Sequence, residues 1–194
     1  MKKAATRKKV AGKTENKRTP AARKPVAAKP NGAGKTIHCT LALTGKWSMV
    51  LPTSTIAEIT DYAPPAPLEN TPPWLLGQVE WEDWQVPVIS YGALIDGETP
   101  ESATAHSRIM VVKSLSSAAR VPFIGVMVRE IPKLANISEN ELQFTGDKGK
   151  SVGVHSRIKL GGQDAVIPDL DRLSQLVGHA AYGTAEKDGP VGQA

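Results

Sequence analysis

Apolar and polar side chains alternate along the chain from residue 37 onwards. In the run IHCTLALT the apolar residues stand at every second position, the spacing that places them on one face of a β-strand. After Gly45-Lys46, the run WSMVLP continues this alternation. Two alternating runs joined by a short turn that contains glycine predict a β-hairpin. The residues expected to face the core are Ile37, Cys39, Leu41, Leu43, Trp47, Met49 and Leu51.

Further short apolar runs predict more strands. In TIAEIT (55–60), Ile56 and Ile59 are expected inside and Glu58 outside. The other runs are RIMVVKSL (108–115), VPFIGVMV (121–128), SVGVHSRIKL (151–160) and QDAVIP from residue 163. The last two are joined by Gly161-Gly162, a two-residue turn of the kind that hairpins use because glycine tolerates a positive φ.

Helical signals are few and short. Asp169 stands where an N-cap is needed before LDRLSQLV, and Ser138 could cap ENEL. Many short strands separated by Gly and Pro favour a small β-barrel over a parallel sheet. The predicted organisation is a basic tail over residues 1–36, a mainly β domain over 37–178 and a flexible tail over 179–194.

The charge of the chain is divided unequally. Residues 1–36 carry twelve Lys/Arg and one acid, a net charge of +11, whereas residues 37–194 carry twelve Lys/Arg and eighteen Asp/Glu, a net charge of −6. The basic segment has almost no apolar residues, so it is predicted to be disordered. Such a segment binds nucleic acid or anionic lipid weakly and in a salt-dependent way. The cations expected to contact a polyanion are Lys2, Lys3, Arg7, Lys8 and Lys9.

Residues for chemistry are not grouped in the sequence. The four histidines are dispersed without metal-ligand spacing, and Cys39 occupies a core-facing strand position. The acids Glu80, Glu82 and Asp83 bracket a predicted turn. NGAGKT, at 31–36, lacks the first glycine of a phosphate-binding loop. We therefore expect no catalytic site, no metal and no cofactor. No apolar run reaches 18 residues and no secretory signal is present, so a cytoplasmic protein is expected.

Three short motifs stand in a fixed order along the domain. Pro72–Gly77 is a Pro-x-x-hydrophobic-x-Gly segment, Val86–Ile89 is a Val-Pro-Val-Ile strand that follows a turn, and Ile167–Leu173 closes with Asp-Leu-Asp-x-Leu. With the order of the predicted strands, these motifs resemble the CheW family, the adaptor proteins of bacterial chemosensory arrays. The resemblance covers about residues 37–178. The resemblance implies two small five-stranded, SH3-like β-barrels that share a hydrophobic seam, with short helices.

The resemblance also implies a function in binding and no catalysis. Members of this family couple chemoreceptor input to a histidine kinase: they bridge the regulatory domain of a CheA-type kinase to the cytoplasmic tip of the receptors. The residues expected to contact these partners are Ile56, Glu58, Gly77, Glu82, Asp83 and Trp84. Trp74 is expected in the core, and Trp84 is the tryptophan expected to be exposed.

The chain departs from the family pattern in charge. The family commonly has Arg-Gly in the turn before the Val-Pro-Val strand, and this chain has Glu82-Asp83. Ser90 and Arg129 replace two family aspartates. Charges at the rim of an interface govern partner choice, so a divergent paralogue is expected, of the kind that serves type IV pili and twitching motility. The alternative is a β-barrel nucleic-acid-binding protein whose cationic tail supplies the affinity.

Overall fold

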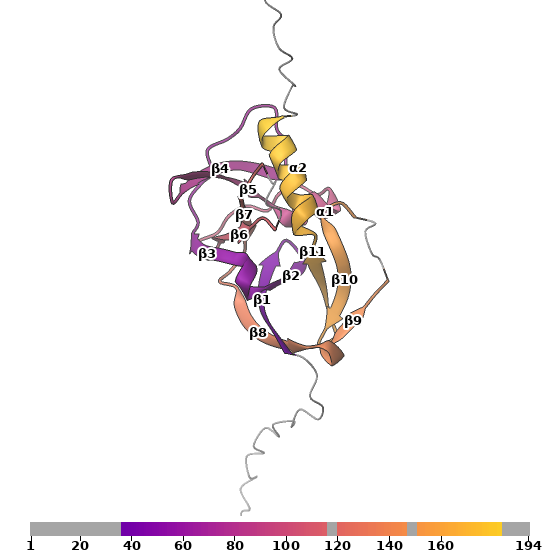
Figure 1. The fold of residues 1–194 in the computed structure, drawn as a ribbon. Coiled ribbons are helices and arrows are strands. Elements are labelled where there is room, and N and C mark those ends of the chain that lie inside the picture. The colour runs from indigo at the N-terminus through magenta and orange to yellow at the C-terminus, as the bar shows by residue number, and fades with distance from the viewer. Residues whose placement is uncertain (1–35, 116–119, 147–150, 184–194) are drawn as a thin grey trace, which may run out of the picture. The chain divides into compact units, whose positions relative to one another are not determined.

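The computed structural model describes residues 36–115, 120–146 and 151–183 of the 194-residue chain. These residues form two antiparallel-rich sheets and two α-helices, with strands that are short and separated by turns (Figure 1). The six-stranded sheet has the order β8-β1-β2-β11-β10-β9, and the five-stranded sheet has the order β3-β6-β7-β5-β4. The mainly β, two-sheet fold expected from the sequence is therefore confirmed. One sheet has six strands instead of five, because the three-residue strand β9 is added at its edge.

The first two strands and the last four form one sheet, and the five strands between them form the other. The six-stranded sheet contains β1 (Thr36–Thr44), β2 (Trp47–Pro52), β8 (Lys133–Ser138), β9 (Leu142–Phe144), β10 (Val154–Leu160) and β11 (Gln163–Pro168). The five-stranded sheet contains β3 (Ile56–Asp61), β4 (Leu75–Trp81), β5 (Trp84–Ile89), β6 (Arg108–Lys113) and β7 (Phe123–Val128). The α-helices are α1 (Tyr91–Asp96) and α2 (Leu170–Tyr182), and the 3-10 turns are η1 (Thr53–Thr55) and η2 (Glu139–Glu141).

The predicted hairpins are present. β1 pairs with β2 through a register that sets Thr44 opposite Trp47, and β10 pairs with β11 with Leu160 opposite Gln163. The turn between β10 and β11 holds Gly161 and Gly162 at φ 57° and 84°, the positive values for which glycine was expected.

Three apolar clusters fill this architecture. One lies inside the six-stranded sheet, around Cys39, Val50 and Ile158, and one inside the five-stranded sheet, around Val88 and Met127. The third lies between the sheets and takes residues from both sheets and from both α-helices. We call this third cluster the seam; its larger members are Met49, Leu51, Ile89, Tyr91, Met110, Val126, Leu173 and Val177.

Because of the seam, some strands bury both faces, which changes the core positions expected for β1. In β1 the alternate face, with Thr40, Ala42 and Thr44, is buried more deeply than Leu41 and Leu43, which are half-buried. In β6, Ile109 and Val111 fill the barrel core while Met110 and Val112 fill the seam. A strand between two cores buries both faces, so its sequence is continuously apolar.

Ile37 and Ile59 were predicted to be buried and are exposed. Ile37 lies at the outer end of β1, beyond the core. β3 is an edge strand with a bulge between Ile56 and Glu58, which changes the face that each later residue presents. Glu58 is exposed, as expected.

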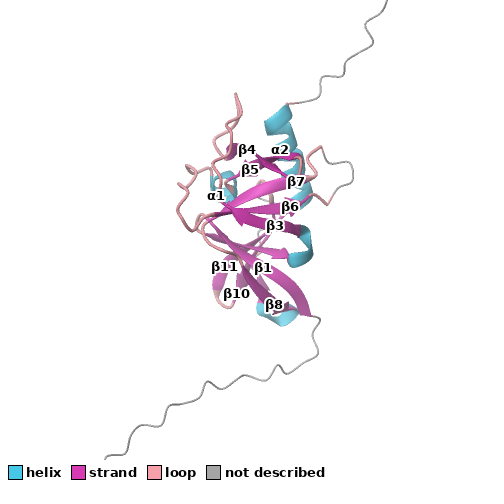
Figure 2. Ribbon diagram, turned by 90° about the vertical axis from the view of Figure 1, so that its left-hand side faces the viewer, coloured by secondary structure: helices cyan, strands magenta, loops and turns pink. Residues whose placement is uncertain are grey.

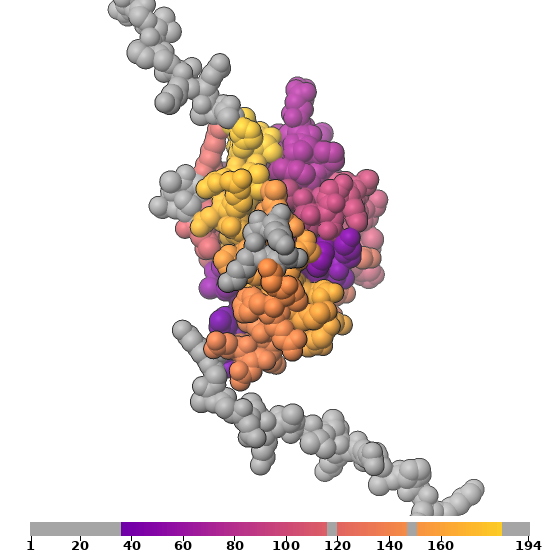
Figure 3. Space-filling model, turned by 90° about the vertical axis from the view of Figure 1, so that its right-hand side faces the viewer, coloured from indigo at the N-terminus to yellow at the C-terminus, as the bar shows by residue number. Residues whose placement is uncertain are grey.

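Helix α2 covers the seam and forms part of the molecular surface (Figures 1 and 3). Asp169 caps it, since its Oδ1 accepts a 2.9 Å hydrogen bond from the Arg172 backbone N–H. The helix buries Leu170, Leu173 and Val177 and continues to Tyr182. The folded part therefore extends four residues past Gly178, where the domain was predicted to end. The predicted helix at ENEL is one 3-10 turn, closed by a capping box between Ser138 and Glu141.

Tyr91 joins the two halves of the seam. Its ring is fully buried, and its hydroxyl donates a 3.0 Å hydrogen bond to the Gly153 carbonyl, which also accepts from the Asp169 backbone N–H at 3.0 Å. The Gly92 N–H, next along α1, donates to Thr44 Oγ1 of β1 at 3.2 Å. Figure 2 shows the two sheets that these bonds connect, with β3, β6 and β7 lying above β1 and β8.

Replacing Tyr91 by Phe is expected to lower the free energy of unfolding by about 1 kcal/mol, because one buried hydrogen bond is lost while the ring is kept. Chemical denaturation measures this change. Tyr182→Phe is the matched control, since the Tyr182 hydroxyl is exposed and its bond to the Gln85 carbonyl is 3.4 Å long. Equal effects of the two substitutions would contradict the role of Tyr91.

The same site predicts a dependence on pH. Burial raises the pKa of Tyr91 above its usual value near 10, so the folded state favours the neutral phenol. The stability that this preference contributes is complete below pH 10 and is lost as the pH rises further. Between pH 9.5 and 11.5 the melting temperature of the wild type should fall more steeply than that of Tyr91→Phe; parallel slopes would contradict this assignment.

Candidate functional site

Three aromatic rings meet at one end of the five-stranded sheet. Trp81 ends β4, Trp84 begins β5 and Phe123 begins β7. The centroids of Trp81 and Phe123 are 4.9 Å apart and those of Trp84 and Phe123 are 5.6 Å apart, both edge-to-face. Edge-to-face packing is the favoured arrangement of such rings. We call Trp81, Trp84 and Phe123 the aromatic end.

The β-sheet register explains why these rings meet. Trp81 pairs with Trp84 across the β4–β5 turn, and β7 lies directly beside β5. Counting by twos along β4 and β5, the two tryptophans share a face with Val79 and Val86, which belong to the barrel core. The rings therefore cap this core instead of lying on the outer face of the sheet. Trp84 is nevertheless 48% exposed.

Glu58 connects the aromatic end to β3. Its Oε2 accepts a hydrogen bond of 2.6 Å from Trp81 Nε1. β3 and β4 are the two edge strands of the sheet, so this bond links opposite edges. A bond to an ionised carboxylate is stronger than a neutral one. Glu58 thus has a structural partner as well as an exposed position.

The turn of the β4–β5 hairpin has an unusual composition. Glu82 and Asp83 adopt φ values of 45° and 65°, as a type I′ turn requires. Such turns strongly prefer Asn-Gly or Gly-Gly, because other side chains are strained at positive φ. Both acids are exposed, and no ion pair of the described residues includes either of them.

The structure brings together four of the six residues predicted to contact partners: Glu58, Glu82, Asp83 and Trp84. Phe123, which sequence reasoning missed, completes the cluster. The signal that would have found it is the pairing of β5 with β7, which no local pattern reveals. Lys113, opposite Phe123 in the β6–β7 register, is an exposed cation at the same end.

The other two predicted residues lie elsewhere. Ile56 is half-buried and packs against the seam. Gly77 is buried, and its assignment as a partner contact stays a prediction. It has φ 135°, and a Cβ there would lie 2.2 Å from the Ala66 carbonyl oxygen. The glycine is therefore needed for the close approach of the proline-rich link. The cations Lys2, Lys3, Arg7, Lys8 and Lys9 lie outside the described residues.

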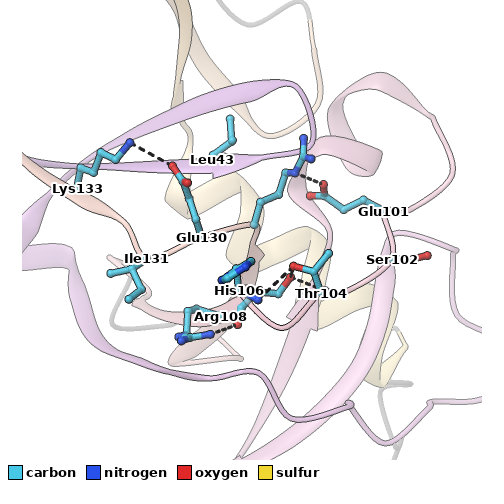
Figure 4. Close-up of a pocket in the computed structure, with 11 residues that line it drawn as sticks. Leu43, Glu101, Ser102, Thr104, His106, Arg108, Glu130, Ile131 and Lys133 are labelled. Carbon is cyan, nitrogen blue, oxygen red and sulfur yellow. Dashed lines mark hydrogen bonds and ion pairs between the residues drawn. The ribbon is translucent and has the colours of Figure 1, made fainter.

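A broad groove lies at the opposite end of β6 and β7 (Figure 4). It has a volume of about 810 Å³ and is lined by the end of β1, the loop before β6 and the loop after β7. Its charges are paired: Arg129 with Glu101 at 3.3 Å, and Lys133 with Glu130 at 3.3 Å. Arg108 pairs with Asp61 at 3.2 Å. The groove thus combines apolar surface with paired charges, and Ile131, 62% exposed, is its most exposed apolar side chain.

A second, apolar opening of about 300 Å³ lies at the six-stranded sheet, between β1, β8 and β9. Ile37 and Phe144 stand at it, and Cys39 lines it. Burial raises the pKa of the Cys39 thiol, which keeps this cysteine protonated and a poor nucleophile. The remaining lining residues are Val50, Pro52, Ile137, Glu139, Leu142 and Ile167.

The described ranges contain no group of three or more His, Cys, Asp or Glu placed to hold a metal ion. In the same part of the chain, no helix combines the length and the hydropathy that crossing a membrane requires.

The model of one protein family, the CheW-like domain, matches residues 39–177. The chain belongs to the CheW family. The solved structure described as scaffolding protein TtCheW from Thermoanaerobacter tengcongensis has the same fold, with a TM-score of 0.58 and 17% sequence identity. The match covers 70% of this chain and 90% of that one. No curated protein matches the sequence.

The turn of this CheW-family protein yields a prediction. Asp83→Gly should raise the free energy of unfolding by about 0.5–1 kcal/mol, because glycine adopts φ 65° without strain. Thermal denaturation measures the change. The reciprocal control is Gly162→Asp in the β10–β11 turn, at φ 84°, which should be destabilising. A lower melting temperature for Asp83→Gly would show that the turn is not strained.

Proposed function

We propose that this CheW-family protein is a non-catalytic adaptor that couples chemoreceptors to a CheA-type histidine kinase. An adaptor needs two surfaces that can be occupied together. The aromatic end and the groove meet this requirement, because Lys113 and Phe123 stand at one end of the paired strands β6 and β7, and Arg108 and Val128 at the other. Six residues of strand separate them by roughly 17–20 Å.

The aromatic end is the surface that we assign to the regulatory domain of the kinase. The observation that carries this assignment is that Trp84 is exposed and yet held in place. Its ring packs against Phe123, which also packs against Trp81, and Glu58 accepts a hydrogen bond from Trp81. Tryptophan is enriched among the residues that dominate binding energy at interfaces. A ring fixed before binding loses little conformational freedom when the partner docks.

The groove is the surface that we assign to the cytoplasmic tip of the receptors. Its volume can accept side chains from one face of a receptor helix. The ion pairs around Ile131 give it the mixture of polar and apolar surface that transient interfaces have. Each contact on its own would be of modest affinity, and the many copies in an array would strengthen both through multivalency.

The charge of the turn supports a divergent member of the family. Glu82 and Asp83 present negative charge where the family commonly presents an arginine, so a partner with complementary positive charge is expected. We place the protein in the cytoplasm, at membrane-associated or polar arrays. Its membership of a system that controls type IV pili and twitching stays a prediction.

The rival function, a nucleic-acid-binding barrel, receives little support from the described surface. Its aromatic rings are bordered by Glu58, Glu82 and Asp83, and acids repel phosphate. Weak contact of nucleic acid or anionic lipid with the basic residues 1–36 stays a prediction from their composition.

A substitution in one surface should weaken binding of its own partner and leave binding of the other partner unchanged. Trp84→Ala is expected to weaken binding of the kinase regulatory domain at least tenfold and to leave binding of a receptor-tip fragment unchanged; Ile131→Arg should do the opposite. Isothermal titration calorimetry with both partners from the same organism measures this. Leu134→Ala is the control, since Leu134 is 77% exposed and lies on neither surface. Loss of both activities in a folded Trp84→Ala variant would contradict separate surfaces, and unaltered kinase binding would contradict the assignment of the aromatic end.

A further inference from the structure

The two sheets have four edge strands, and three of these edges are protected against pairing with another chain. β3 and β4 each contain a bulge. β4 is also covered, because Ala66 of the proline-rich link exchanges two backbone hydrogen bonds of 2.8 Å with Gln78. β9 has only three residues. Bulges, covering segments and shortness are the usual devices that prevent a sheet edge from pairing.

The fourth edge strand, β8, shows none of these devices in the described part of the chain. Its six residues, KLANIS, pair with β1 in an unbroken register and include no proline. No described strand lies on its other side. Leu134, 77% exposed, is the most exposed of the large apolar side chains that the structure describes. A regular, open edge with an apolar side chain is a template for a further strand.

The backbone groups of β8 that point away from β1 can be identified. The Ser138 N–H donates to Glu141 Oε2 at 2.7 Å, so it does not point to β1. Because this direction alternates along a strand, Leu134 and Asn136 also direct their N–H and C=O groups away from β1. The side chains agree: Asn136 Oδ1 lies 2.6 Å from Nδ1 of His38, its partner in β1, and side chains are closest in pairs without backbone hydrogen bonds. Leu134 and Asn136 thus offer two donors and two acceptors at the open edge.

An open hollow of about 420 Å³ lies beside Leu134. The β1–β8 register sets Leu134, Asn136 and His38 on the same face of the sheet, and all three line the hollow together with Thr53. The hollow therefore opens on the face that carries Leu134. It has room for a leucine side chain from another strand.

We propose that β8 pairs with β8 of a second copy of this chain, antiparallel and about a twofold axis, so that the two six-stranded sheets become continuous. Leu134 of each copy lies opposite Asn136 of the other, and its side chain enters the hollow of the other copy. Each of these two residue pairs exchanges two backbone hydrogen bonds, so all the outward groups of Leu134 and Asn136 are used.

The neighbouring registers are less favourable. A shift in one direction sets Leu134 opposite Ser138, whose N–H is already bonded to Glu141. A shift in the other direction sets Asn136 opposite Pro132, which has no N–H to donate.

Self-complementarity favours a second copy over another protein. Two identical strands that pair antiparallel satisfy a twofold interface, the commonest symmetry of protein dimers. The start of each β8, at Lys133, then lies near the end of the other, where Glu139 is exposed, so opposite charges approach at both ends. The interface is small, so we expect a weak dimer that high local concentration favours. Leu134 lies on neither surface assigned above, so this inference does not rest on the proposed function.

The first test is sedimentation velocity of the full chain between 10 µM and 1 mM, in 0.5 M salt to screen association through charge. The wild type should change from monomer to dimer over this range. Leu134→Lys should weaken self-association at least tenfold, because it removes the apolar side chain from the hollow and places a charge at the edge. Leu134→Pro should do the same, because it removes an outward N–H and no bond to β1.

Leu115→Lys is the matched control for this measurement. Leu115 is 62% exposed and lies outside β8, so the substitution should leave self-association unchanged. A wild type that stays monomeric at 1 mM would overturn the proposal and leave the edge to a different partner. Equal effects of Leu134→Lys and Leu115→Lys would overturn it as well.

Disulfide trapping tests the register. Opposite residues of a hydrogen-bonded pair have Cα atoms about 5.5 Å apart, within reach of a disulfide. In an oxidised mixture of Leu134→Cys and Asn136→Cys chains, the disulfide between the two variants should exceed its statistical share about fivefold. Cys39 is buried and does not compete. Links at the statistical ratio, or no links, would overturn the proposal. Because no kinase or receptor is present, failure here leaves the proposed function intact, and failure to bind a kinase leaves these tests unaffected.

Discussion

The seam between the two sheets is the constraint on which the rest of the structure depends. It joins β2, β10 and β11 to β4–β7, and both α-helices contribute side chains to it. Burial of this apolar surface is worth about 25 cal/mol per Å², and neither sheet could leave its seam face in water. Apolar burial alone does not fix how the two sheets are oriented. The hydrogen bond from the Tyr91 hydroxyl to the Gly153 carbonyl adds a specific contact between them.

The seam also determines where function can lie. Strands with both faces buried, such as β6 and β7, have no free face for a partner. Their ends remain available: the aromatic end caps one end of the five-stranded sheet, and the groove opens at the other. A fold that buries its strand faces in packing therefore leaves strand ends and turns for the binding surfaces that we propose. This is also where side chains vary most easily without disturbing the core.

Much of this fold was accessible from the sequence, for identifiable reasons. The Gly45-Lys46 and Gly161-Gly162 turns and the Asp169 cap depend on local chemistry, and each was predicted correctly. β8 was missed because it is an edge strand with one buried residue, Ile137. α1 was missed because it has only six residues and contains Gly92. In β1 the more deeply buried face was not predicted, because the seam adds a second core that no alternation in the sequence records.

The candidate site was also predictable only in part. Trp84 and the acidic turn could be singled out because they are local features of one hairpin. Phe123 could not, because its contact with both tryptophans depends on the parallel pairing of β5 with β7. The structural role of Gly77 could not be read from the sequence either, because the close approach of the Ala66 backbone that requires a glycine there depends on the fold.

We propose that the aromatic end and the groove are separate surfaces that can be occupied together. The most direct measurement is the mass of the complex formed when the full chain is mixed with the kinase regulatory domain and a receptor-tip fragment, by sedimentation velocity. If the surfaces are separate, a ternary complex forms in which the affinity for each partner is unchanged by saturation with the other. Displacement of one partner by the other would show that they share one surface, and the proposal of two surfaces would be wrong.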